Sequence, residues 1–143
     1  MVYQQKTKVE DQPIATFLNS VTPPGRQTEA RQLVTLFSDV TGYAPRIHTG
    51  GMVGFGLYAY TYASGHSGTA MATGFAPRKA ELSIYVLAGY EGLGAMLDRL
   101  GKHRIGKACL YLRHLSDADE TVLRELIAAG LADLKTRWPV LPT

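Results

Sequence analysis

The chain has 143 residues, 45% hydrophobic and 19% charged, a balance that argues against disorder and predicts one domain over 1–143 with its core within roughly 9–138. Its 15 lysines and arginines exceed its 12 acidic residues, and the net charge of +3 permits an anionic partner without requiring one. A single cysteine excludes an intramolecular disulfide. The lack of a signal-peptide pattern and of an apolar run of ~20 residues predicts a cytoplasmic protein with no membrane partner.

The first third of the chain predicts two helices. Apolar residues recur at helical spacing over 14–21 and again over 30–37. Asp11 and Pro13 suit the start of the first helix, and Gly42 suits the end of the second.

From residue 51 the apolar period changes to two, which predicts a strand with Val53, Phe55 and Leu57 on one face. Strands are also predicted over 69–76 and 82–87, and short turns between them favour antiparallel hairpins. A helix over 90–100, a strand over 108–115 and a last helix capped by Ser116 follow. The order ααβββαβα predicts an α+β fold, with an antiparallel sheet of about four or five strands and helices packed on one face.

The stretch GKHRIGKAC, 101–109, has the spacing of a phosphate-binding loop. Such a loop leaves a strand and opens a helix, whereas here a helix is predicted before it and a strand after it. Ala108 also stands where a hydroxyl would hold magnesium. We therefore expect a structural loop. The functional alternative is that Lys102, His103, Arg104 and Lys107 present amides and positive charge to an anion.

Tyrosines alternate along the predicted strands. Together with Arg113, five of them are expected on the sheet face opposite the helices: Tyr58, Tyr60, Tyr62, Tyr85 and Tyr111. A face of this kind suits a small ligand or a homodimer interface, because a tyrosine ring packs while its hydroxyl seeks a partner. Basic residues do not interleave along these strands, which disfavours a nucleic-acid partner.

The leading hypothesis is a non-catalytic module that binds a small anionic ligand at the edge of this tyrosine face. Pro77 fixes a turn and holds the following cations at a strand end. Ser64 and the tyrosines would orient the ligand. The predicted ligand-binding residues are Tyr58, Tyr60, Tyr62, Ser64, Arg78, Lys79, Tyr85, Lys102, Lys107, Tyr111 and Arg113.

No catalytic or metal-binding residue is predicted, and no cofactor. The histidines at 48, 66, 103 and 114 do not pair with one another or with Cys109 at ligand spacing. A lone cysteine at the head of a strand is more often a small buried apolar residue than a nucleophile.

Three stretches, GMVGFGLYAYTYASGHSG, TGFAPRKAELSIYVL and LGKHRIGKACLYLRHLSDADETVLRELI, resemble the YdhG-like domain, a widespread bacterial domain of unknown function. The resemblance covers nearly the whole chain and implies a compact α+β domain with an antiparallel sheet. Some members of that family are labelled frataxin-like iron chaperones. That label implies iron held by carboxylates, for which Asp117, Asp119 and Glu120 are the candidates. Homodimerisation and iron delivery remain as alternative functions.

Overall fold

Four α-helices and one seven-stranded antiparallel sheet form the fold in the computed structural model, which describes residues 9–86, 93–106 and 109–143. The elements are α1 (Ile14–Ser20), α2 (Pro24–Thr41), β1 (Pro45–His48), β2 (Met52–Thr61), β3 (Ser67–Pro77), β4 (Leu82–Tyr85), α3 (Gly94–Leu100), β5 (Arg104–Ile105), β6 (Cys109–Leu112), the short 3₁₀ helix η1 (Leu115–Asp117), α4 (Glu120–Arg137) and β7 (Val140–Leu141).

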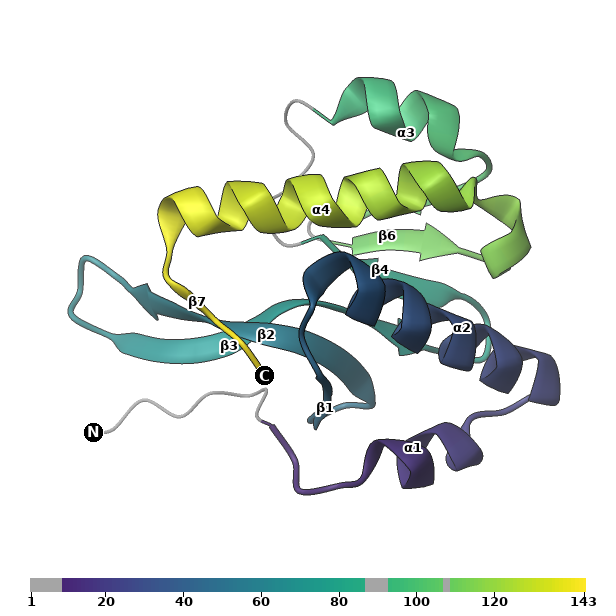
Figure 1. Ribbon diagram of the computed structural model, residues 1–143, viewed down its shortest axis with the longest axis horizontal. Helices are drawn as coiled ribbons and strands as arrows, with labels where there is room; N and C mark the ends of the chain where they lie inside the picture. Colours follow the sequence, from purple (N-terminus) through teal and green to yellow (C-terminus); the bar gives the residue numbers. More distant parts are fainter. Residues whose placement is uncertain (1–8, 87–92, 107–108) are drawn as a thin grey trace.

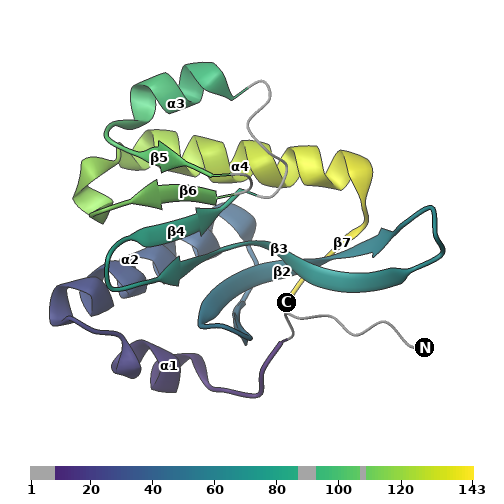
Figure 2. The same ribbon diagram turned by 180° about the vertical axis from the view of Figure 1, so that it is seen from behind.

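The two long helices, α2 and α4, cover one face of the sheet, and the other face is open in the reverse view (Figures 1 and 2). This confirms the α+β class and the one-sided helix layer. Within the part of the chain that is described, no helix combines the length and apolarity needed to cross a bilayer.

The helix ends follow local chemistry. Gly42 ends α2 in the left-handed conformation, with φ of 73°, as its position predicted. The predicted cap of the last helix was wrong by three residues. Asp119, and not Ser116, caps α4, and its carboxylate accepts a hydrogen bond from the Val122 amide at 3.2 Å. Residues 115–117 form η1 in front of it.

The sheet has the strand order β1-β2-β3-β4-β6-β5, and β7 pairs with β2 on the β1 side. The strands β1, β5 and β7 were not predicted. Their lengths of four, two and two residues are too short to show an alternating pattern. Each lies at an edge of the sheet, so the observed sheet has more strands than were predicted but remains an antiparallel sheet of the same fold class.

The main core lies between α2, α4 and the centre of the sheet. The ring of Phe37 in α2 stacks on Phe55 with centroids 5.2 Å apart, and its centroid lies 5.6 Å from that of Phe75. Ile84 and Leu110 pair across β4 and β6 and are fully buried in the same cluster. These apolar contacts hold both long helices to the sheet.

Strand β2 changes which residues face the helices at Gly56, whose φ is +74°. Before this point Phe55 faces the core. After it, Tyr58 packs against a second cluster formed by Ala72 of β3 with Leu131 and Leu134 of α4. Strict alternation would place Phe55 and Tyr58 on opposite faces, so the glycine interrupts the period-two pattern.

The predicted common tyrosine face is therefore wrong. Tyr58 lies on the α4 side of the sheet. Tyr85 alternates with the core residue Ile84, and Tyr111 lies between the buried Leu110 and Leu112, so these two point to the open face. The tyrosine rings fall on two layers of the molecule.

One buried group gives the fold a pH dependence. His48 is 2% exposed, and its Nε2 has no hydrogen-bond partner among the described residues. Burial, and secondarily the charge of Arg46, lowers the pKa of His48 below its ordinary 6.5. Below pH 6.5 the unfolded chain therefore binds more protons at residue 48 than the native state does. The free energy of unfolding falls as the pH drops from 6.5 to the pKa that His48 has in the native state.

We expect the His48→Gln variant to show a flatter fall in unfolding free energy than the wild type between about pH 7 and 5, measured by urea denaturation. His66→Gln, at the exposed tip of the β2–β3 hairpin, is the control and should keep the wild-type slope. An unchanged slope in His48→Gln would contradict the assignment.

Candidate functional site

A hollow with a volume of about 460 Å³ lies at the N-terminal end of α2. Three segments far apart in sequence form it: the start of α2, the turn between β3 and β4, and the segment that follows β6. We call it the first hollow. Its lining residues are Pro23, Gly25, Arg26, Glu29, Lys79, Ala80, Arg113 and His114.

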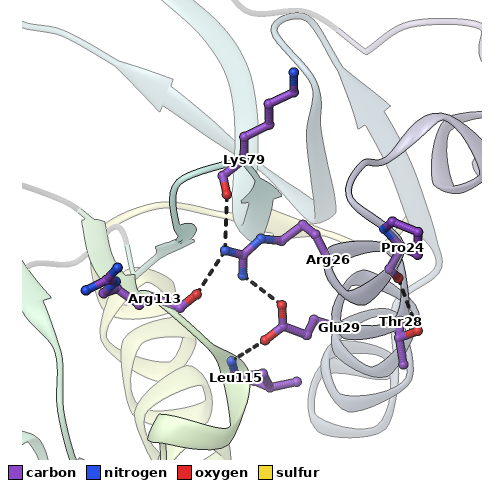
Figure 3. Close-up of polar contacts among 7 residues, drawn as sticks. All are labelled: Pro24, Arg26, Thr28, Glu29, Lys79, Arg113 and Leu115. Carbon is purple, nitrogen blue, oxygen red and sulfur yellow. Dashed lines mark hydrogen bonds and ion pairs between the residues drawn. The ribbon is translucent and has the colours of Figure 1, made fainter.

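A buried ion pair forms one wall of the first hollow (Figure 3). Arg26 Nη1 donates to Glu29 Oε1 at 2.8 Å, and the two side chains are 5% and 16% exposed. Arg26 Nη2 donates to the Arg113 carbonyl at 2.9 Å and to the Lys79 carbonyl at 3.4 Å. Glu29 Oε2 accepts from the Leu115 amide at 2.5 Å. The pair therefore ties α2 to segments more than fifty residues away in sequence.

The hydrogen bonds of this wall leave one donor unused. Both carboxylate oxygens of Glu29 are occupied, by Arg26 and by the Leu115 amide. The Nε of Arg26 is buried and has no hydrogen-bond partner within the described part of the chain. Buried donors are normally satisfied, so this group is an exception.

Positive charge dominates the first hollow. Arg26, Lys79 and Arg113 line it, and Glu29 is the one carboxylate among the lining residues. Lys79 and Arg113 form no ion pair with any residue that the structure describes, and their side chains extend away from Arg26 (Figure 3). The N-terminus of the 18-residue helix α2 adds a partial positive charge.

A second hollow, of about 200 Å³, adjoins the first. Its lining residues are Glu81, Lys102, His103, Arg104, Tyr111, Arg113 and Asp117. Arg104 pairs with Glu81 at 2.5 Å, and its Cζ lies 4.1 Å from the centroid of the Tyr111 ring. The guanidinium of Arg104 is therefore engaged by both a carboxylate and an aromatic face.

Four of the predicted ligand-binding residues line these hollows. Lys79 lies in the first, Lys102 and Tyr111 lie in the second, and Arg113 lines both. Lys107 lies outside the described residues.

Other predicted residues lie elsewhere. Arg78 donates to the Gly50 carbonyl at 2.6 Å and so holds the turn between β1 and β2. Ser64 is exposed at the tip of the β2–β3 hairpin. Tyr85 is half-buried on the open face of β4 and lines neither hollow.

The β2 tyrosines form a ring series along the hairpin. Ring centroids are 5.9 Å apart for Tyr58 and Tyr60, and 4.9 Å apart for Tyr60 and Tyr62. Tyr60 is buried and Tyr62 is exposed. Burial, and then the neighbouring Tyr62 and Tyr60, raises the pKa of Tyr58, which keeps its phenol neutral. This series packs the hairpin and touches neither hollow.

Sequence reasoning missed Arg26, Glu29 and His114. Arg26 and Glu29 stand three positions apart in α2, before the apolar stripe that predicted this helix, and that is the usual spacing of a solvated surface pair. Their burial depends on Lys79 and Arg113, whose positions no local pattern reveals. His114 was noted only as one of four scattered histidines.

The resemblance to a phosphate loop is not supported by the local structure. Gly101 ends α3 with φ of 108°, and the chain then enters β5, which pairs with β6 as a hairpin. A Cβ at Gly101 would lie 2.3 Å from the Asp117 carbonyl oxygen, so the glycine permits close contact between two segments. The helix precedes the strand, as predicted.

The three carboxylates considered for iron are used in other ways. Asp119 caps α4, Glu120 lies 3.7 Å from Arg124, and Asp117 lines the second hollow. Over 9–86, 93–106 and 109–143, no three His, Cys, Asp or Glu side chains gather as a metal site would require. Scans against models of protein families, curated proteins and solved structures found no match for this chain.

Proposed function

We propose that this chain is a cytoplasmic, non-catalytic module that binds a small anion in the first hollow. The observation that carries the proposal is the charge balance of the lining: Arg26, Lys79 and Arg113 line the first hollow with a single carboxylate, whose oxygens are both occupied. The resemblance to YdhG-like domains, a family of unknown function, is compatible with a binding module.

In the proposed binding, the residues of the first hollow have three different roles. Arg26 is fixed by Glu29 and by two carbonyls, so it supplies a positive charge that needs no reorganisation. Lys79 and Arg113 are exposed on flexible stems, which lets their charged ends turn over the mouth of the hollow. Gly25 supplies the first amide N–H of α2, because Pro23 and Pro24 have none.

Gly25 also offers a test that separates binding from folding. A Cβ at this position would meet no atom within 4 Å, so a side chain fits there without displacing the protein. An aspartate in the first turn of a helix favours the helix dipole, and α2 has no acidic residue there. The Gly25→Asp variant should therefore fold at least as stably as the wild type while placing a negative charge in the first hollow.

We expect inorganic phosphate or pyrophosphate to bind the wild type, and Gly25→Asp to weaken that binding by at least about tenfold in calorimetric titration. Gly25→Ala is the matched control, because it adds a Cβ without charge and should retain most of the affinity. Absence of binding to the wild type, or equal affinity in Gly25→Asp, would contradict the proposal.

A further inference from the structure

We infer that the first hollow selects its ligand by ionisation state: it binds the doubly ionised form of a phosphate monoester and rejects the form whose phosphate still carries a proton. This inference rests on the proposed function and names the class of anion. Two features of the described lining carry it, namely an excess of positive charge and a single carboxylate whose oxygens are both occupied.

The excess positive charge of the lining matches two negative charges on a ligand. Arg26 and Glu29 compensate each other as a buried ion pair at 2.8 Å. Lys79 and Arg113 remain, and neither forms an ion pair within the part of the chain that the structure describes. Because the attraction between charges scales with their product, a dianion gains about twice the attraction of a monoanion at these two cations.

The hydrogen-bonding groups of the lining suit an anion without a proton. A protonated phosphate oxygen is a donor and needs an acceptor. The one lining carboxylate, Glu29, already accepts from Arg26 Nη1 and from the Leu115 amide. The carbonyls of Lys79 and Arg113 accept from Arg26 Nη2. A proton on the ligand would therefore compete with the bonds that form this wall, whereas fully ionised oxygens only accept from donors.

The volume of the first hollow favours a monoester over a bare dianion such as sulfate. Small-molecule sites have volumes of roughly 300–1,000 Å³. The first hollow, at about 460 Å³, falls in this range, and Pro23 and Ala80 add apolar groups to its lining. A phosphate bound by the two cations thus leaves room for a short organic group.

Glycerol 3-phosphate and sulfate are the probes, because only the first changes its ionisation near neutral pH. A phosphate monoester loses its second proton near about pH 6, so about one tenth of it is doubly ionised at about pH 5 and nearly all of it at about pH 8. Sulfate is doubly ionised throughout. In calorimetric titration of the wild type, the affinity for glycerol 3-phosphate relative to that for sulfate should fall about tenfold from the higher pH to the lower. At the higher pH glycerol 3-phosphate should bind more tightly than sulfate.

The ratio of the two affinities cancels changes in the protein's own charge, including a proton gained by His114, which also lines the first hollow. His114→Gln should therefore keep the fall in the ratio. Lys79→Ala should weaken the binding of both probes. Lys135→Ala, at the far end of α4 from the first hollow, is the matched lysine control and should alter neither affinity (Figure 1).

A ratio that stays constant between the two pH values would overturn selection by ionisation state and leave the first hollow as an anion site. Loss of the fall in His114→Gln would overturn it equally, because the histidine would then be the group that senses pH. Tighter binding of sulfate at the higher pH would overturn the assignment to a monoester. If neither probe nor inorganic phosphate binds the wild type at either pH, both this inference and the proposed function fail.

Discussion

The Arg26→Met variant should unfold with a free energy lower than that of the wild type by about 3–5 kcal/mol, because it leaves the Glu29 carboxylate without its buried partner. The same change removes the hydrogen bonds from Arg26 to the Arg113 and Lys79 carbonyls. Both losses act at the junction of α2 with the turn after β3 and the segment after β6. Urea denaturation followed by circular dichroism measures the difference.

A double variant distinguishes the cost of an orphaned charge from the cost of lost packing. Arg26→Met with Glu29→Leu removes both charges, so it should recover a substantial part of the stability that Arg26→Met alone loses. Strictly additive losses in the two single variants and the double would contradict a coupled pair. Arg137→Met is the surface comparison, since Arg137 and Asp133 are 57% and 45% exposed, and it should cost no more than about 1 kcal/mol.

The elements that the sequence predicted are those with enough residues to show a period. The apolar stripe of α2 and the alternation of β4 gave the right element types because each buries one face against the core. The short edge strand β1 has four residues and begins with proline, so its pairing with β2 was not visible. Turn chemistry predicted the end of α2 because Gly42 acts locally.

The candidate site could be predicted only in part, because the sequence shows local patterns and does not show contacts between distant segments. Lys79 and Lys102 were named as candidates because cations beside turns are visible in sequence, and Arg113 was named from its place beside the tyrosines on a predicted strand. The wall that organises them depends on hydrogen bonds from Arg26 to Arg113, 87 residues away, and from Leu115 to Glu29, 86 residues away. Pairings at that separation are set by the packing of α2 on the sheet and leave no local pattern.

The misplaced tyrosine face has a different cause, which is the conformation of a single residue. Strict alternation along β2 places Tyr58 opposite Phe55, and that assumption fails at Gly56. A glycine inside a strand often marks an irregularity of this kind. Only glycine adopts a φ of +74° at little cost, so the residue that disrupts the pattern is also the one that makes the disruption possible.

The Gly56→Ala variant is therefore expected to lose about 2–5 kcal/mol of unfolding free energy. A positive φ costs a non-glycine residue about 1–2 kcal/mol. The new Cβ would also lie 2.7 Å from Cδ2 of Tyr43 and 3.3 Å from the Leu141 carbonyl oxygen, which adds an overpacking cost of about 1–3 kcal/mol. Trp138, the one tryptophan in the chain, packs against the same cluster as Tyr58. Its fluorescence during urea denaturation reports on this region directly.

Gly65 separates the two contributions, because it has a φ of +90° at the hairpin tip and a Cβ there would meet no atom within 4 Å. Gly65→Ala carries the conformational cost without the clash, so it should lose about 1 kcal/mol and leave the Trp138 emission of the native state unchanged. Equal losses in the two variants would show that contact with Tyr43 does not restrict residue 56. A larger loss in Gly56→Ala, with altered native Trp138 emission, would tie the backbone at this glycine to the packing of the β2 tyrosines beneath α4.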